Sequence, residues 1–250
     1  MGDIKFRIAH ISDTHISDFG QYVDNAFEEG VKLVNKLVPK PNIIVHSGDL
    51  TDNGVLSEYK LALDKMSEFD QRIVITAGNH DQRNFGNSLF DEFIGKLDYE
   101  LRIEDFQFLI INSAQPDRDE GRIGRRRMEW ISNTLAKDKI KILVFHHHLI
   151  PVPYAGREAN VLEDAGDILE MAIRNKVHLV LMGHRHVRNV IKVEDLILVN
   201  AGTFSCRRTR GKFGYSFNLI GITEENEVYI HEVSIDYGKT TLLKKYNLRF

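Results

Sequence analysis

Cysteine is almost absent from this sequence, since Cys206 is the only one in 250 residues. A single thiol cannot form an intrachain disulfide, so the fold has to be stabilised by its core. One cysteine also fits a reducing cytosol. We expect Cys206 to be an inert thiol, because nothing around it in the sequence supplies a base partner.

Long apolar runs are missing as well, and none approaches the ~18 residues that a membrane helix needs. The first residues enter a strand-like pattern directly and show no signal peptide. Gly2 is no myristoylation signal, because Phe6 stands where a Ser or Thr is required. We therefore expect a soluble, cytoplasmic protein with no membrane partner.

Charge of one sign does not dominate either, because the formal net charge is −3 and the pI is about 6.4. A broad nucleic-acid interface usually needs a basic excess, so nucleic acid is expected here only as a substrate. Hydrophobic residues make up 42% and charged residues 28%, which is typical of a soluble globular protein. Without a linker or repeat, residues 1–250 are expected to form one domain.

The first third of the chain alternates short apolar runs with longer amphipathic ones. This β-α-β-α-β order favours a parallel sheet covered by helices. The expected strands are 6–11, 43–46 and 73–76, and the expected helices are 22–38 and 55–69.

The rest of the chain is richer in strands. Tyr99–Ile103 and Phe106–Asn112 predict an antiparallel pair that turns at Glu104 and Asp105. Further strands are expected at 141–145, 178–181, 190–193, 197–200, 215–221, 228–233 and 241–246, with helices at 128–135 and 168–174. The simplest architecture is an α/β domain of two stacked mixed sheets with helices outside both.

Carboxylate, amide and imidazole side chains recur directly after apolar strands. In open α/β sheets, ligands bind outside the carboxyl ends of the strands, so these side chains should converge on one rim. They are Asp13 and His15, Asp49, Asn79 to Asp81, His146 to His148, and His184 and His186.

This donor set contains oxygen and imidazole nitrogen but no thiolate, which suits Mn, Fe, Zn or Ni. Seven or more ligands are too many for one zinc ion, which takes about four. They suit two divalent ions roughly 3.5–4 Å apart with a bridging carboxylate. Such a pair lowers the pKa of a bound water to ~7, which makes hydroxide available for in-line attack at phosphorus.

Each motif alone has an ordinary explanation as a turn or a helix cap, but these explanations do not predict all five together in this order. The order Asp-x-His, Gly-Asp, Gly-Asn-His-Asp, His-His and Gly-His-x-His resembles the calcineurin-like metallophosphoesterase superfamily. The motifs extend from Asp13 to His186. The resemblance implies a four-layer α/β/β/α sandwich and hydrolysis of a phosphoester.

The resemblance also implies roles for individual residues. One metal would be held by Asp13, His15 and His186, a second by Asn79, His147 and His184, and Asp49 would bridge them. His80 would face the scissile phosphate as proton donor or charge stabiliser, with Asp81 orienting it. Asn79, His80 and Arg83 would contact the substrate.

The three consecutive histidines leave one ligand ambiguous. Family members often have the sequence His-His-Pro, in which the ligand lies two residues before the proline. Here Leu149 stands where that proline is expected. We assign His147, with His146 as the alternative.

Gly-Asn-His-Asp-Gln-Arg at 78–83 is similar to the motif of bacterial cyclic-nucleotide and glycerophosphodiester phosphodiesterases. A phosphodiesterase is therefore the leading interpretation. A phosphomonoesterase or nuclease with the same centre is the first alternative, and a non-catalytic scaffold is the second. The leaving-group side of the pocket distinguishes a diesterase from a monoesterase or a nuclease. This side is expected to lie in loops 85–91, 113–127 and 151–160.

Several basic residues have no assigned role. The run from Arg122 to Arg127 favours a solvated loop over a lid, and one arginine of 207–212 is a candidate substrate contact. His10, His46, His178 and His231 lie on strand-like runs and are expected to be core or surface residues. The oligomeric state stays open, and a homodimer is compatible with the sequence.

Overall fold

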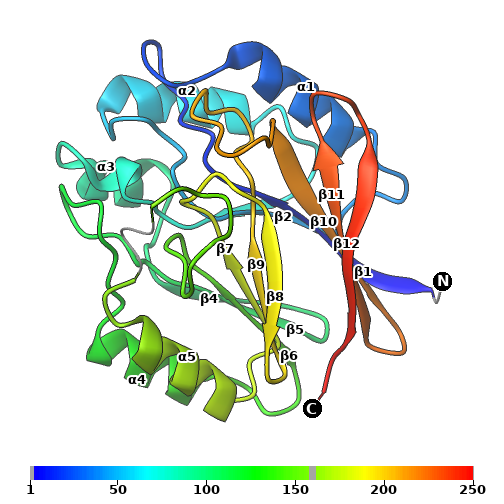
Figure 1. Cartoon of the computed structure of the whole chain (residues 1–250). Coiled ribbons are helices and arrows are strands. Elements are labelled where there is room, and N and C mark those ends of the chain that lie inside the picture. The colour runs from blue at the N-terminus through cyan, green and yellow to red at the C-terminus, as the bar shows by residue number, and fades with distance from the viewer. Residues whose placement is uncertain (1–2, 158–161, 250) are drawn as a thin grey trace.

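The computed structural model describes residues 3–157 and 162–249. Two six-stranded mixed sheets pack face to face, and helices cover the outer side of each (Figure 1). The expected four-layer α/β/β/α sandwich is confirmed.

The first sheet has the strand order β12-β11-β10-β1-β2-β3. Its strands are β1 (Ile4–Ile11), β2 (Ile43–His46), β3 (Ile73–Ile75), β10 (Ser216–Thr223), β11 (Glu227–Ser234) and β12 (Thr240–Asn247). β1, β2 and β3 are parallel, as the sequence predicts, and β10 pairs with β1 in the antiparallel sense. The carboxyl ends of the three parallel strands therefore lie on one edge.

The second sheet has the strand order β4-β5-β6-β7-β9-β8. Its strands are β4 (Tyr99–Ile103), β5 (Phe106–Ile110), β6 (Ile140–Val144), β7 (Leu179–Met182), β8 (Asn189–Val193) and β9 (Leu196–Asn200). The predicted hairpin is confirmed, because Ile103 pairs with Phe106 across β4 and β5. Strands β5, β6, β7 and β9 are parallel.

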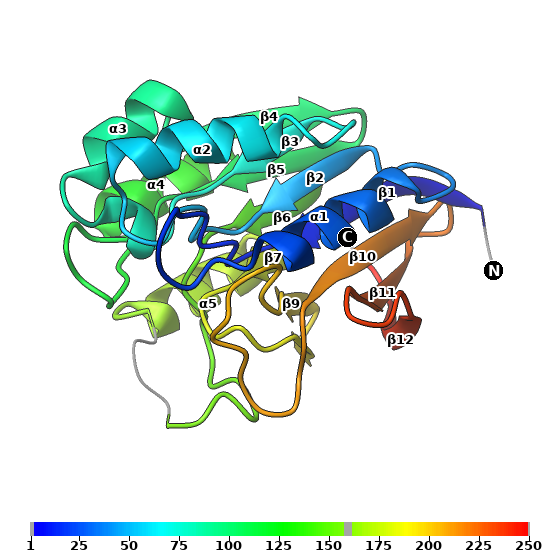
Figure 2. The ribbon, with the colours of Figure 1, turned by 90° about the horizontal axis from the view of Figure 1, so that it is seen from above.

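Helices α1 (Asp24–Asn35), α2 (Leu56–Met66) and α3 (Gly86–Phe93) lie on the side of the first sheet, and α4 (Arg125–Thr134) and α5 (Ala165–Arg174) on that of the second (Figures 1 and 2). Helix α1 buries Phe27, Val31 and Val34, which share one helical face. Over the described ranges, no helix is long and apolar enough to cross a bilayer.

Two segments that the sequence predicts as loops, 85–91 and 113–127, are partly helical. Residues 86–93 form α3 although Gly86, Asn87 and Ser88 are weak helix formers, because Phe90 packs against Tyr59. Helix α4 begins at Arg125, so the end of the expected 113–127 loop is helical. In the expected 151–160 loop, residues 158–160 lie outside the described part of the chain.

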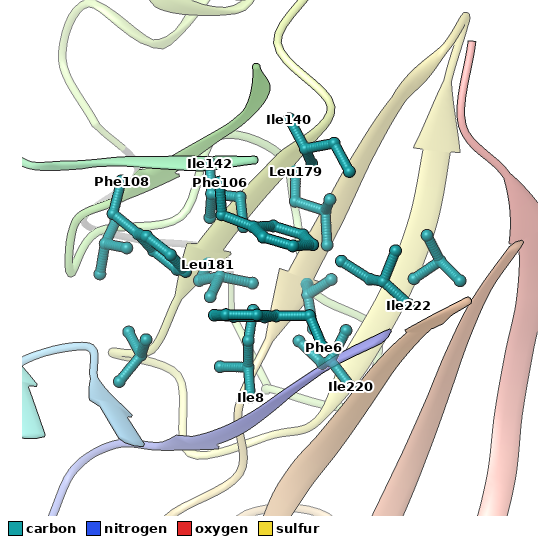
Figure 3. Packing of buried hydrophobic residues seen from close by; sticks show 14 of the residues in the cluster. Phe6, Ile8, Phe106, Phe108, Ile140, Ile142, Leu179, Leu181, Ile220 and Ile222 are labelled. Atoms are coloured by element: carbon teal, nitrogen blue, oxygen red, sulfur yellow. The ribbon is translucent and has the colours of Figure 1, made fainter. Parts of the chain in front are cut away.

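The main core lies between the two sheets. Phe6 of β1 stacks on Phe106 of β5 with ring centroids 4.0 Å apart (Figure 3). Phe6 and Ile8 face the second sheet, while Ala9 and Ile11 pack in the cluster beneath α1 and α2, as the two-residue period of a strand requires. This apolar core is separate from the polar loops at the strand ends.

We expect Phe6→Ala to lower the free energy of unfolding by about 3–5 kcal/mol, because the truncation leaves a cavity between the sheets. Chemical denaturation of the metal-free protein would measure the loss. Phe6→Leu is the matched control and should lose less, since it fills more of the same space. Equal stability of Phe6→Ala and the unsubstituted protein would contradict this account of the core.

Candidate metal centre

The loops that follow β1, β2 and β7 turn through strained backbone. Asp13, Asp49 and His184 have φ values of 54°, 54° and 72°, in the left-handed region that non-glycine residues rarely adopt. Hydrogen bonds from the Asp13 amide to the Gly48 carbonyl (3.0 Å) and from the His15 amide to the Asp49 carbonyl (3.0 Å) join two of these loops. Such strain persists where the surrounding structure fixes it, as at functional sites.

Gly48 allows the first two loops to approach the second sheet. Its φ is 97°, and a Cβ atom at this position would overlap the ring of His146. The glycine of the Gly-Asp motif therefore serves both the turn and the close contact with the loop after β6.

The first group of converging donors is fully buried, and its ligand atoms lie within 4.8 Å of one another. It consists of Asp13, His15, Asp49 and His186. His186 Nδ1 donates to the Arg208 carbonyl (2.8 Å), which leaves its Nε2 lone pair 3.3 Å from Asp13 Oδ1. His15 Nδ1 donates to Asp52 Oδ1 (2.9 Å), and its Nε2 lies 3.5 Å from Asp49 Oδ2.

The second group contains Asp49, His146 and His184. His146 Nδ1 donates to the Ser47 carbonyl (2.8 Å), so its Nε2 lone pair faces Asp49 Oδ2 at 3.2 Å. Asn79 Oδ1 joins the group, 3.2 Å from His146 Nε2 and 3.1 Å from His184 Nδ1. Asp49 is therefore common to both groups.

Lone pairs face one another in both groups, an arrangement that needs positive charge between them. Within the described residues, His15 Nε2 is buried without a hydrogen-bond partner. Without a metal, a proton can supply that charge: burial disfavours a charged His146, yet the Asp49 and Asp13 carboxylates outweigh it and raise the pKa of His146 to about 9. The donor set thus fits two cations that share Asp49.

Of the two candidate histidines, the structure brings His146 and not His147 into the second group. His147 Nδ1 lies 2.8 Å from Ser113 Oγ, and its Nε2 lies 3.1 Å from the Asp119 carbonyl. The two residues are adjacent at the end of β6, so the turn of the backbone points their rings in different directions. The geometry therefore favours the alternative, His146, over the initial assignment.

Sequence reasoning missed Asp52. Its carboxylate accepts the hydrogen bond from His15, and its carbonyl accepts one from His80 Nδ1 at 2.6 Å. Asp52 Oδ1 also lies 3.5 Å from His80 Nδ1. The available signal was its position three residues after Asp49, on the same loop.

Asp81 does not orient His80, contrary to the expectation. Its carboxylate accepts backbone N–H groups of Leu50 (3.1 Å), Thr51 (2.8 Å) and Gly78 (2.8 Å). Burial, and then the nearby Asp49, raise the pKa of Asp81. Asp81 therefore ties the loop after β2 to the loop after β3, while Asp52 contacts His80.

Arg83 borders the site. Its Nη1 lies 3.0 Å from His80 Nδ1, and its Nη2 donates to Asp119 Oδ1 at 2.6 Å. Farther along the chain, Arg127 pairs with Asp98 at 2.8 Å on the side of the second sheet. The guanidinium of Arg127 is thus used in packing α4.

Other unassigned residues lie closer to the centre than expected. Cys206 is buried with its sulfur in a group with His15 and His186, so two imidazoles lie near this thiol. Arg207 and Arg208 are exposed, and Arg208 reaches the site through its carbonyl.

The strand histidines support the loops. His46 accepts from the Gly48 amide (3.2 Å) through Nδ1 and therefore donates to Thr14 Oγ1 (3.0 Å) through Nε2. His10 and His178 are also buried, and His231 is half-buried. Burial lowers the pKa of His46 to about 4, which keeps it neutral.

Comparison with known families agrees with this geometry. Residues 6–188 match the family model described as calcineurin-like phosphoesterase. The chain belongs to this family. All the motif residues from Asp13 to His186 lie within the matched segment.

Curated relatives include a probable glycerophosphodiester phosphodiesterase of Arcobacter nitrofigilis, 33% identical over 154 residues, or 56% of each chain. The 3′,5′-cyclic adenosine monophosphate phosphodiesterase of Escherichia coli is 26% identical over 197 residues, which cover 74% of this chain and 71% of that one. The chain spans only a little over half the length of the first of these relatives.

Among solved structures, a dimetal phosphatase from Danio rerio is similar in fold. It has a TM-score of 0.72 at 14% identity, and the match covers 97% of this chain and 100% of that one. This likeness supports the four-layer arrangement.

We expect His146→Ala to weaken binding of added Mn²⁺ far more than His147→Ala, because only His146 presents a lone pair to Asp49 and Asn79. Calorimetric titration of metal-free protein would rank the two variants. A larger loss for His147→Ala would return the assignment to His147.

Proposed function

We propose that this protein hydrolyses phosphodiesters at a dinuclear metal centre. The observation that carries the proposal is the pair of buried donor groups that share the Asp49 carboxylate. Membership of the calcineurin-like phosphoesterase family supports it.

In this proposal, Asp13, His15 and His186 would hold one divalent ion and Asn79, His146 and His184 would hold the other, and Asp49 could serve both. Mn, Fe, Zn and Ni all suit this donor set. When bound, the two ions supply Lewis-acid charge to the phosphate and activate water at neutral pH. The protein fixes the ligand geometry through the carbonyls of Ser47 and Arg208 and the carboxylate of Asp52.

His80 is the proposed proton donor to the leaving oxygen. Its Nδ1 is bound to the Asp52 carbonyl, so Nε2 is the nitrogen left for the substrate. Burial opposes the charged ring, but Asp49 and Asp52 outweigh it and raise the pKa of His80. A group that donates a proton to a leaving oxygen must carry that proton near neutral pH, and the contacts of His80 Nδ1 with Asp52 favour the protonated ring. Arg83, beside His80, is positioned to contact an anionic phosphate.

A diester is the proposed substrate class for two reasons. The Gly-Asn-His-Asp-Gln-Arg segment resembles that of bacterial phosphodiesterases, and the named relatives include enzymes for cyclic nucleotides and glycerophosphodiesters. Both names refer to phosphates that carry two ester bonds.

Protein reconstituted with Mn²⁺ should bind two ions per chain and turn over bis(p-nitrophenyl) phosphate and 3′,5′-cyclic AMP faster than p-nitrophenyl phosphate. Elemental analysis and parallel assays would measure both. Asp49→Ala should lose metal and activity together, because Asp49 belongs to both groups. A stoichiometry of one at saturating metal, or preference for the monoester, would overturn the proposal.

His80→Ala should retain both ions and lose ~10²–10⁴-fold in turnover, the usual contribution of general acid–base catalysis. The loss should be larger for an alkyl ester than for a nitrophenyl ester, since nitrophenolate leaves without a proton. Turnover of both esters by one metal-counted preparation would test this. Equal losses on the two esters would argue against proton donation.

A further inference from the structure

The side-chain amide of Asn79 has two chemically different ends, and only its oxygen can bind a cation. Oδ1 faces the second donor group, 3.2 Å from His146 Nε2 and 3.1 Å from His184 Nδ1. A rotation of the amide by 180° would place its NH₂ group there instead. The second group is therefore complete only while something holds the amide in one orientation.

Asp119 is the residue in contact with the other end of this amide. Its Oδ1 accepts a hydrogen bond from Asn79 Nδ2 at 3.1 Å. An ionised carboxylate can only accept, so the NH₂ end must face Asp119 and the oxygen must face the histidines. Forty residues separate Asp119 from Asn79 in the sequence, so no local pattern reveals this contact.

Asp119 is held in place by His147, the histidine that does not join the donor group. His147 Nε2 donates to the Asp119 carbonyl at 3.1 Å, and the Ser113 hydroxyl donates to His147 Nδ1 at 2.8 Å. Gly121 lets the loop pass over the ring, because a Cβ there would overlap it.

The same carboxylate also binds Arg83, whose Nη2 donates to Asp119 Oδ1 at 2.6 Å. Contact with a guanidinium, which stays protonated in proteins, favours the ionised form of this carboxylate. One carboxylate thus contacts both a proposed metal ligand and the arginine beside His80.

We propose that Asp119 is a positioning residue, which fixes the Asn79 amide with its oxygen toward the second metal and keeps Arg83 beside His80. The proposal rests on the proposed dinuclear function. It gives His147 the role of anchoring Asp119 through its backbone.

Asp119→Ala should lower Mn²⁺ affinity at one of the two sites, the one that contains Asn79, by ~10–100-fold, the range typical of residues that orient metal ligands. Asp119→Asn retains an oxygen that accepts from Asn79, so it should restore much of the affinity. Glu120→Ala is the matched control, because it removes a neighbouring negative charge whose ion-pair partner is Arg118. Calorimetric titration of metal-free protein, checked by circular dichroism, would compare the four proteins.

Unchanged affinity at both sites in Asp119→Ala, with two ions bound in the unsubstituted protein, would overturn the positioning role and leave the proposed function intact. A loss equal to that of Glu120→Ala would overturn it as well, because a general charge effect would then suffice. Failure of the unsubstituted protein to bind a second ion would overturn both proposals. Separate measurement of kcat and KM for Asp119→Ala gives a second readout. A misplaced Arg83 should raise KM for the diester.

Discussion

The Asp49 carboxylate imposes the constraint on which the rest of the site depends. It lies in both donor groups, 3.5 Å from His15 Nε2 and 3.2 Å from His146 Nε2. Each of these nitrogens has its partner nitrogen already committed as a donor, so both turn lone pairs toward a negative charge. This concentration of unprotonated donors in a buried place is unfavourable unless positive charge enters. Hydrogen bonds from the neighbouring loops keep these donor atoms directed toward Asp49.

The residues behind the donor groups act through hydrogen-bond direction. Carbonyl oxygens of Ser47, Arg208 and Asp52 can only accept, so each fixes which nitrogen of an imidazole carries the proton. The carboxylates of Asp52 and Asp119 do the same for His15 and for the amide of Asn79. Acceptors outside the site thereby select the atoms that point into it.

The strained loops are tolerated because the core that stabilises the fold lies elsewhere. Phe6, Phe106 and their neighbours fill the space between the sheets, and further clusters pack beneath the helices on each outer face. The polar residues occupy the carboxyl ends of the strands, where left-handed turns at Asp13, Asp49 and His184 aim side chains inward. A ligand can therefore be replaced without removing an apolar contact of the main core.

The sequence alone determined the strands, the parallel start of the first sheet and the rim on which the ligands meet, because these follow from apolar periodicity and from residues placed directly after strands. It could not predict α3, whose weak helix formers are held by the contact of Phe90 with Tyr59. Nor could it choose His146 over His147, or Asp52 over Asp81 as the partner of His80. Those choices depend on the direction of each side chain after a tight turn and on partners far along the chain. Only the packing of the two sheets brings such partners together.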